Sequence, residues 1–435
     1  MRKAGGVRRA ADQLNVTPGA VSQQIRRLEE TVGQPLLHRN GKQVSLTEQG
    51  ERLLSYARRI LALEQEAREV VTRPASEGVL RLGLPESTPA FTVQINCGSG
   101  MQSMDTAFRT IEGGHADIVL AGGAESLSHS PLVLRREAVD WFARLNGARS
   151  TGDRLKVLAG LKPGFLKPEI GLERGLTDPI TDLGMGQTAE KIGHIFGVTR
   201  RDADAYAAES HRRLAAAQAE GRLAGELLPA VARDGQVFDH DDGVRPDSSV
   251  KSLSTLKPVF EKPYGNVTAG NSSQITDGAA WTILASEDAV RKHGLKPLAR
   301  IVDSHWGALD PSIMGLGPVM ATAPILKRRN LSIGDIDLWE LNEAFAAQVL
   351  ACLAAFEDAQ VCRDVLGFDG AAGTIDRERL NVDGGAISLG HPVGTSGTRI
   401  ALHLANAMRQ RGLKQGIATE CIGGGQGGAM LLEAA

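Results

Sequence analysis

The chain has 435 residues, of which 42% are hydrophobic and 23% charged, and its net charge is -2. This length accommodates two or three domains, and the composition is that of an ordinary globular protein. A net charge near zero excludes a global field that would attract the whole chain to nucleic acid or to a membrane surface. The charge is unevenly distributed, however: residues 1–73 hold 13 Lys and Arg against 8 Asp and Glu, and the remainder holds 36 against 43. This asymmetry predicts a basic appendage on an acidic body.

Cysteine content and apolar runs indicate the compartment. Four cysteines in a chain of this length exclude a disulfide framework. The sequence has no C-x-x-C and no Cys/His spacing typical of a metal site. No apolar run approaches the ~20 residues of a membrane helix, and the basic N-terminus lacks the apolar segment of a signal peptide. We therefore expect a cytoplasmic protein with free thiols, no metal and no membrane insertion.

The basic segment at the front of the chain has the pattern of two short helices followed by a hairpin. A first helix is expected over Val7–Leu14, and Thr17 can cap a second helix that has Pro18 at its first position. That second helix carries apolar residues at helical spacing, which we expect to face inward: Val21, Ile25 and Leu28. The turn at Asn40-Gly41-Lys42 predicts a small hairpin, and a long helix is expected from Thr47 to about Val71.

This segment resembles the winged helix–turn–helix of LysR-type transcriptional regulators. The matching string is A-A-D-Q-L-N-V-T-P-G-A-V-S-Q-Q-I-R-R-L-E-E, followed by S-L-T-E-Q-G. The resemblance implies an all-α DNA-binding domain over residues 1–75 with its second helix in the major groove. The residues that would contact DNA are Thr17, Ser22, Gln23 and Arg26. The alternative is a generic helical hairpin with a solvated basic face.

The LysR-like segment departs from its family at both ends. Family members carry one more helix in front of it, and its absence here should expose Ala10, Leu14 and Ile25. The effector-binding domain of the family is also missing, because the chain changes character beyond Gly83.

The body shows one pattern twice: a strand, a reactive residue in a glycine-rich turn, a helix and another strand. The first copy has a strand at Phe91–Asn96, Cys97 in N-C-G-S-G, a helix to about Glu112 and a strand at Asp117–Ala121. This order predicts a β-α-β unit of a parallel sheet. The second copy runs through Asn342, His391 and Cys421. It predicts strands at Ile336–Leu341 and Ile417–Glu420 and a helix at Gly394–Met408. The duplication predicts two α/β sheets packed back to back, with the reactive residues at strand ends.

Residues 128–265 interrupt this pattern as an insertion. Helices are expected near Met185–Phe196 and Arg201–Gln218, and a strand at Ala279–Ala285 follows the insertion. A large insertion over an active site often binds the remote part of a substrate.

The thiols and the imidazole suggest acyl transfer through a thioester. Cys97 is expected at a helix start, where free N–H groups lower a thiol pKa, and His391 can take its proton. Cys421 supplies a second thiol, and the following glycines let backbone N–H groups such as that of Gly423 approach an oxyanion. The structural alternatives are a small buried hydrophobe for Cys97, a loop histidine for His391 and strand-end packing for Cys421. Asn342 is equally compatible with a helix N-cap.

Other residues carry weaker signals. Cys352 and Cys362 lie in no motif and are expected to be packing residues. Neither glycine-rich run is followed by a Walker lysine or by the acidic residue of a dinucleotide-binding fold. This absence disfavours nucleotide hydrolysis and NAD binding.

The body resembles the thiolase family, in particular the degradative 3-ketoacyl-CoA thiolases. The motifs are N-C-G-S-G-M-Q-S, G-G-A-E-S, M-G-Q-T-A-E, T-A-G-N-S-S, L-N-E-A-F-A, G-G-A-I-S-L-G-H-P-V-G-T-S-G and C-I-G-G-G-Q-G-G-A. The resemblance implies duplicated α-β-α layers, with one half over 82–286, containing the insertion 128–265, and the other over 287–435. The string L-E-R-G-L-T-D-P is more similar to the long-chain branch of fatty-acid oxidation.

The thiolase resemblance also implies an activity and a set of site residues. The activity is cleavage of 3-ketoacyl-CoA by CoA to acyl-CoA and acetyl-CoA, with CoA as co-substrate and no metal or redox cofactor. Asn342 would hold a water that completes the oxyanion site of His391. Arg245 matches a position near the CoA phosphate, and Ala269 and Ser273 match the pantetheine groove. A solvated surface residue is the alternative for Arg245. Homodimers or tetramers are expected.

The body also departs from its family. The thiolase pattern has about two strands and two helices before the strand that leads to the nucleophile, and here these elements are replaced by the LysR-like segment. Strand 91–96 should therefore lose its neighbour, at a cost of ~1–3 kcal/mol for each unpaired buried group. Three hypotheses follow: an acyltransferase with a vestigial DNA-binding head, a DNA-binding regulator whose body serves for oligomerisation, or an inactive chimera.

Overall fold

The computed structural model describes residues 11, 17–40, 43–50, 53–54, 84, 87–231 and 235–435. Internal contacts divide the chain into a first unit, Met1–Glu77, and a second unit, Gly78–Ala435. This division lies between the expected domain boundaries at residues 75 and 82. Within the described ranges, no helix is both long and apolar enough to cross a bilayer.

The first unit contains the expected second helix and the hairpin. Helix α2 (Pro18–Val32) begins after Thr17, whose side chain accepts a hydrogen bond from the Ala20 N–H at 3.2 Å. Strands β1 (Leu37–Asn40) and β2 (Gln43–Leu46) pair in antiparallel register. The predicted cap and hairpin are therefore confirmed.

The small core of the first unit differs from the prediction at one position. Val21 is buried with Ala11, and Ile25 packs partly against them, whereas Leu28 is 46% exposed on α2. The apolar face of α2 is thus buried at Val21 and exposed at Leu28. Thr47 caps the segment that follows the hairpin, because its hydroxyl accepts from the Gly50 N–H at 3.0 Å. Most of the expected helices Val7–Leu14 and Thr47–Val71, including Ala10 and Leu14, lies outside the described residues.

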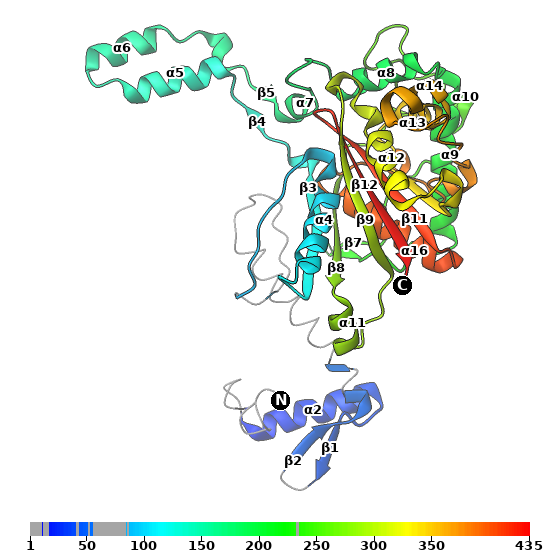
Figure 1. The fold of residues 1–435 in the computed structure, drawn as a ribbon. Helices are drawn as coiled ribbons and strands as arrows, with labels where there is room; N and C mark the ends of the chain where they lie inside the picture. The colour runs from blue at the N-terminus through cyan, green and yellow to red at the C-terminus, as the bar shows by residue number, and fades with distance from the viewer. Residues whose placement is uncertain are drawn as a thin grey trace. The chain divides into compact units, whose positions relative to one another are not determined.

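The second unit is built on two sheets. The larger has the order β10-β11-β12-β9, in which β10 pairs with β11 in parallel and the other pairs are antiparallel. The smaller pairs β3 with β8 in antiparallel fashion. The bounds of these strands are β3 Ile118–Ser126, β8 Asp277–Ala285, β9 Ala299–Ala308, β10 Leu338–Leu341, β11 Gln415–Ile422 and β12 Gln426–Ala434. Figure 1 shows β9, β11 and β12 running side by side.

Two helices lie between the sheets, so the expected back-to-back packing is wrong. Helix α4 (Ser99–Glu112) packs on β3 and β8, and α16 (Ser396–Arg411) packs on β10 and β11 as well as on α4 and β8. Their shared core is apolar and includes Met101, Leu404 and Ala418. Because each helix has apolar residues on more than one face, both sheets can be covered by the same helical layer.

The strand expected at Phe91–Asn96 does not form. Residues 91–95 have no regular structure, Phe91 is 77% exposed, and no strand among the described residues lies beside them. A strand needs a partner for its backbone N–H and C=O groups, so a good strand sequence without a neighbour stays irregular. The predicted parallel β-α-β unit is therefore wrong as well, since β3 instead pairs antiparallel with β8.

The outer face of the larger sheet is covered by α12 (Gly317–Arg329) and α13 (Ala346–Glu357). Their apolar side chains form the largest core of the second unit, around Trp339 and Phe356. Helix α13 is apolar all round, which explains why nearly all of its residues are buried.

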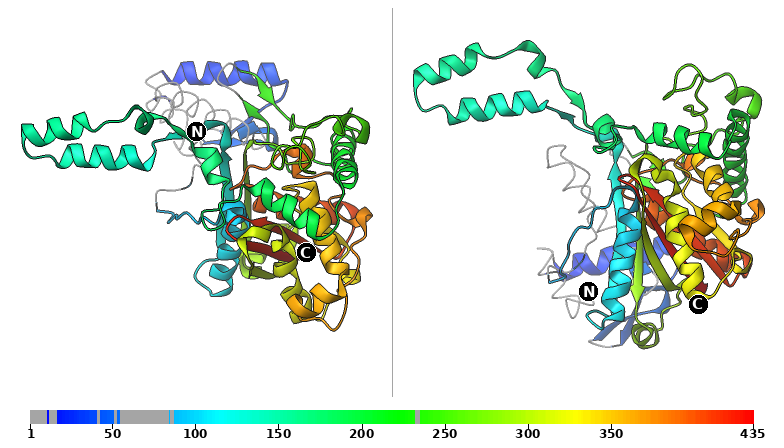
Figure 2. Two further views of the ribbon diagram at one scale, coloured as in Figure 1. Left: turned by 90° about the horizontal axis from the view of Figure 1, so that it is seen from above. Right: turned by 45° about the horizontal axis from the view of Figure 1, so that its top comes forward.

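The insertion is helical, as expected. Helices α8 (Met185–Ile195) and α9 (Arg200–Ala219) match their predicted bounds to within about a residue. Helices α5 (Arg136–Gly147) and α6 (Thr151–Ala159) form a hairpin that projects from the body of the second unit (Figures 1 and 2). The Trp141 indole N–H joins them by donating to the Val157 carbonyl at 2.7 Å.

Short elements complete the second unit. The strands are β4 Leu132–Val133, β5 Glu169–Ile170, β6 Ala230–Val231 and β7 Val237–Phe238. The short helices are η1 Asn96–Gly98, η2 Leu127–His129, η3 Pro163–Leu166, α7 Gly171–Gly175, α10 Val250–Leu253, α11 Glu287–His293, η4 Pro311–Leu316, η5 Ile333–Asp335, α14 Ala359–Val361, η6 Cys362–Leu366, η7 Arg377–Arg379 and α15 Ala386–Leu389.

Candidate active site

Cys97 lies in η1, two residues before Ser99, the first residue of α4. The glycines around it are required by close packing. A Cβ on Gly98 would stand 2.4 Å from Ile422 Cδ1, and a Cβ on Gly100 would stand 2.7 Å from the Thr398 backbone nitrogen. Because these glycines have no side chains, the start of α4 packs directly against β11 and α16.

Cys421 reaches the same place from the other end of the chain. It is fully buried near the end of β11, and a turn of three glycines leads from β11 to β12. Gly424 and Gly425 have φ angles of 93° and 78°, a region that favours glycine. The carbonyl of Gly423 accepts a hydrogen bond from Asn96 Nδ2 at 3.0 Å, which fastens this turn to the residue before Cys97.

The Gly423 N–H faces the sulfur of Cys97. This N–H and that of Cys97 itself both favour the thiolate. Two backbone donors therefore converge at this sulfur.

His391 lies in the loop between α15 and α16, with its ring buried. Its backbone N–H donates to the Gln274 carbonyl at 3.0 Å, and its Nδ1 lies 2.6 Å from Ser396 Oγ. Nε2 is buried and has no hydrogen-bond partner in the described part of the chain. A buried ring nitrogen without a partner is the form that a general base takes before substrate arrives.

Asn342 follows β10 and lies beside His391, with its Nδ2 3.5 Å from Nδ1 of the imidazole. The backbone N–H of Asn342 donates to the Thr419 carbonyl at 2.9 Å, two residues before Cys421. Asn342 is not a helix N-cap, because α13 begins at Ala346 after Phe345. Its Oδ1 is buried without a partner among the described residues, and a bound water would satisfy it.

The charge states of these groups differ from the sequence prediction. Burial, and then the Glu420 carboxylate, raise the pKa of Cys97 to about 12, and the two backbone N–H groups only partly offset them. Burial also raises the pKa of Cys421 well above its usual value. The expected lowering of the Cys97 pKa is therefore wrong, because desolvation outweighs the helix start even though the thiol is only half-buried.

Burial and the charge of Arg399 lower the pKa of His391 to about 4. The site consequently rests with two neutral thiols and a neutral imidazole.

Of the three residues expected to contact CoA, Ala269 and Ser273 lie close together in the chain, and Arg245 lies in a separate loop. The Ser273 N–H donates to the Ala344 carbonyl at 3.0 Å, two residues beyond Asn342. Since Gln274 holds the backbone of His391, the 273–274 segment runs beside the imidazole. Ala269 and Arg245 are exposed, and the backbone N–H of Arg245 donates to His211 Nδ1 at 3.1 Å.

Several residues near the site carry no signal that sequence reasoning used. Ser396 fixes the His391 ring and stands in the G-T-S-G that follows it. Glu343 is buried and accepts hydrogen bonds from Tyr206 Oη at 2.9 Å, Ser210 Oγ at 2.7 Å and Asn381 Nδ2 at 3.0 Å. The position of this acid within the largely apolar string L-N-E-A-F-A is the sequence signal that could have indicated its burial. Cys352 and Cys362 are fully buried in the core, as predicted.

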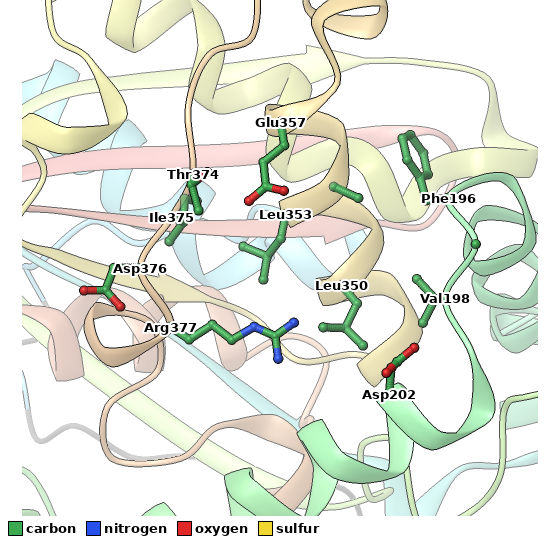
Figure 3. A pocket seen from close by; sticks show the side chains of 12 residues that line it. Phe196, Val198, Asp202, Leu350, Leu353, Glu357, Thr374, Ile375, Asp376 and Arg377 are labelled. Atoms are coloured by element: carbon green, nitrogen blue, oxygen red, sulfur yellow. The ribbon is translucent and has the colours of Figure 1, made fainter.

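A separate hollow of about 460 Å³ lies beside α13 (Figure 3). Leu350 and Leu353 contribute apolar side chains to it, and Arg377 points across it toward Leu350. None of the predicted site residues lines this hollow. In the described ranges, His, Cys, Asp and Glu side chains form no group of three or more suited to a metal ion.

The residues expected to contact DNA lie on or before α2. Thr17 is the helix cap, and Ser22 uses its hydroxyl to donate to the Pro18 carbonyl at 3.0 Å. Gln23 and Arg26 are exposed.

Comparison with known proteins places both halves of the body in one group. Residues 23–288 match the thiolase N-terminal domain, and residues 295–434 match the thiolase C-terminal domain. The first match begins inside α2 and so overlaps the segment expected to be a separate domain. The comparisons give no support to a helix–turn–helix domain in front of the body.

Individual relatives agree with these matches. The chain is 40% identical over 358 residues to mitochondrial 3-ketoacyl-CoA thiolase of Rattus norvegicus, covering 81% of each chain. It is 39% identical over 364 residues to acetyl-CoA acetyltransferase of Syntrophomonas wolfei, covering 83% of each.

Among solved structures, human mitochondrial 3-ketoacyl-CoA thiolase in complex with CoA superimposes with a TM-score of 0.69 at 39% identity, over 81% of this chain and 80% of that chain. Acetyl-CoA acetyltransferase from Syntrophomonas wolfei superimposes with a TM-score of 0.70 at 32% identity, over 81% and 82% of the two chains.

Proposed function

The chain belongs to the thiolase family and is an acetyl-CoA C-acyltransferase of that family, and from this premise we propose that it cleaves 3-ketoacyl-CoA with CoA through a thioester on Cys97. The observation that carries this assignment of roles is the convergence at the start of α4. There the Gly423 N–H faces the Cys97 sulfur, and Cys97 is close enough to Cys421 for a charge on Cys97 to disfavour ionisation of Cys421.

The first half-reaction forms the thioester. His391 Nε2 takes the proton of Cys97, and the sulfur attacks the 3-keto carbon of the substrate. The bond between C2 and C3 then breaks, and the electron pair moves to the acetyl-CoA fragment. Cys421 donates its proton to C2 of that fragment, and acetyl-CoA leaves. The high pKa of Cys421 suits this role, because the thiol stays protonated until a carbanion is present to accept its proton.

The second half-reaction transfers the acyl group to CoA. The Cys421 thiolate takes the proton of the CoA thiol, and the resulting CoA thiolate attacks the thioester carbon. The Cys97 sulfur leaves and recovers its proton from His391, so both thiols and the imidazole return to their starting states. Backbone N–H groups of Gly423 and Cys97 stabilise one oxyanion, and His391 with a water on Asn342 stabilises the other.

The groove for the CoA arm is proposed to run past Ser273 and Ala269 toward Arg245. Ser273 lies next to Ala344 and therefore beside the loop of Asn342. Ala269 and Arg245 are exposed farther out, where the pantetheine and the phosphate groups would lie. The four cysteines are all free, which suits a reducing compartment such as the cytoplasm.

The test is turnover of acetoacetyl-CoA with CoA, followed by loss of the enolate absorbance. Incubation with acetyl-CoA alone should also acetylate Cys97, which peptide mass spectrometry detects. Cys97→Ala removes both signals, whereas Cys362→Ala, which changes a buried thiol in the core, serves as the matched control. Absence of turnover together with absence of acetylated Cys97 would contradict the proposal and favour an inactive chimera.

A second function, DNA binding by the first unit, is favoured by one observation. Helix α2 presents exposed Gln23 and Arg26 and is followed by a β hairpin, which is the order of elements in a winged helix–turn–helix. Gln can read a base edge and Arg can hold a phosphate or a guanine.

A gel shift of a labelled pool of random duplex DNA tests this second function. Binding should weaken steeply with salt, and Arg26→Ala should lower the logarithmic salt slope by about one. Arg291→Ala, which removes an exposed arginine on α11, is the control. Retention that is insensitive to salt, or equal binding by Arg26→Ala, rejects DNA recognition by α2.

A further inference from the structure

Glu420 is a buried acid that the proposed reaction does not use. It stands on β11 immediately before Cys421, paired with Gly428 of β12. Its side chain is fully buried, and neither carboxyl oxygen has a hydrogen-bond partner among the described residues. Side chains alternate along a strand, so Glu420 faces the same side as Ala418, toward the apolar core between β11, α4 and α16.

The carboxyl group of Glu420 lies at the start of α4. A Cβ built on Gly397 would stand 2.4 Å from Glu420 Oε1 and also 2.4 Å from the backbone nitrogen of Met101. Met101 is in the first turn of α4, where the helix dipole is positive. Cys97 lies two residues before the first residue of the same turn. Because Gly397 has no side chain, the Glu420 carboxyl group fits at the N-terminal end of α4, close to Cys97.

Few charged groups act on Glu420. From α16, Arg399 is the cation that favours its ionised form. From η1, Cys97 is disfavoured as a thiolate by a charge on Glu420, and so is Cys421 on its own strand. Arg399 does not neutralise Glu420 completely, because its guanidinium also lies 3.5 Å from Glu340 on β10.

We propose that Glu420 is a positioning residue for the nucleophile: it and Cys97 share the N-terminal end of α4, and only one of these two acids carries a negative charge at a time. The inference rests on the proposed function in one respect, namely that Cys97 is the nucleophile. While Glu420 is a neutral acid, the positive end of α4 is available to the thiolate alone.

The physical reason is mutual repulsion in a desolvated place. A buried carboxylate without hydrogen bonds is strongly disfavoured, and a thiolate close by disfavours it further. Burial accordingly raises the pKa of Glu420 well above its usual value. At alkaline pH, ionisation of Glu420 and ionisation of Cys97 therefore compete, and the two acids titrate as a coupled pair.

The test is the rate at which iodoacetamide alkylates Cys97 between pH 6 and pH 10, followed by peptide mass spectrometry. In Glu420→Gln the rate should match the wild type at the acid end and exceed it roughly tenfold at the alkaline end, which corresponds to about one pKa unit. Glu420→Leu removes the charge with an apolar side chain of similar size and should give the same profile. Thermal unfolding of each variant establishes that it is folded.

Asp204→Asn is the matched control, because Asp204 is another buried acid that is not among the groups acting on the Cys97 thiol or on Glu420. Its profile should follow the wild type. A rate ratio that is the same at every pH, or no difference from wild type in either Glu420 variant, overturns the inference.

Because alkylation needs no substrate, the two proposals fail separately. If the wild-type protein does not turn over acetoacetyl-CoA but its alkylation shows the predicted pH profile, the proposed function alone is rejected. Resistance of wild-type Cys97 to alkylation at every pH rejects both.

Discussion

The Nδ1 atom of His391 and the hydroxyl oxygen of Ser396 lie 2.6 Å apart, and the same hydroxyl lies 3.1 Å from the Pro392 carbonyl. For Nε2 to act as the base, the ring hydrogen of His391 must be on Nδ1; Ser396 then accepts it, and the hydroxyl hydrogen of Ser396 goes to the Pro392 carbonyl. Nε2 is the buried ring nitrogen that has no protein partner in the described ranges.

Ser396→Ala should therefore lower kcat without unfolding the protein. The ring of His391 loses the acceptor that sets its tautomer and orientation, and misplacement of a catalytic group by ~1 Å costs on the order of 100-fold in rate. Turnover of acetoacetyl-CoA gives kcat and KM, and the change should fall on kcat. Ser103→Ala is the control, because that hydroxyl donates to a carbonyl of its own helix α4 at 2.8 Å. Equal kcat in Ser396→Ala and wild type would show that Ser396 does not orient the base.

The low pKa of His391 predicts a loss of stability in acid. The folded protein holds this pKa at about 4, below the usual 6.5, because of burial and Arg399. The unfolded chain consequently binds the proton first, and the free energy of unfolding falls as pH drops from 6.5 to 4. The contribution is about 3 kcal/mol over this window.

Urea unfolding at pH 7 and pH 4 measures this effect. His391→Asn, which has no titrating group, should lose about 3 kcal/mol less than the wild type between the two pH values. Wild-type and variant curves that fall in parallel would contradict burial of a neutral imidazole.

Glu343 should be important for stability, because it accepts hydrogen bonds both from a helix of the insertion and from a residue of the C-terminal half. Tyr206 and Ser210 lie on α9, and Asn381 precedes α15. Glu343→Gln places an amide donor against these donors and should cost about 1–3 kcal/mol.

Tyr206→Phe removes only one of the hydrogen bonds of Glu343 and should cost about 1 kcal/mol. Chemical denaturation compares the two variants. A larger loss in Tyr206→Phe than in Glu343→Gln would show that Glu343 does not organise this network.

Gly100→Ala tests the close approach of α4 and α16. The added Cβ would stand 2.7 Å from the backbone nitrogen of Thr398, which cannot move without shifting α16. We expect a loss of about 1–3 kcal/mol in the free energy of unfolding, together with slower alkylation of Cys97. Gly147→Ala, at the end of α5, meets nothing within 4 Å and should cause no loss. Similar stability of the two variants would mean that the α4–α16 contact is looser than described.

Local pattern was sufficient for much of the structure. Helix α2 follows from its Thr17 cap and its apolar spacing, and α8 and α9 lie where the sequence predicts helices. Strand Phe91–Asn96 failed for the opposite reason: its residues favour a strand, but a strand forms only when a neighbour exists to pair with it. The orientation of β3 could not be predicted either, since direction of pairing depends on which strand arrives beside it.

Sequence motifs alone singled out Cys97, His391, Cys421 and Asn342 as candidate site residues, because glycine-rich turns next to a thiol, an imidazole or an amide can be recognised from the local sequence. The tertiary structure decided their charge states and their supports. Desolvation by surrounding chain raises the thiol pKa values and lowers that of the imidazole, and no local string encodes how much chain will surround a side chain. Ser396, Glu343 and Glu420 acquire their significance in the same way, through contacts with segments far away along the polypeptide.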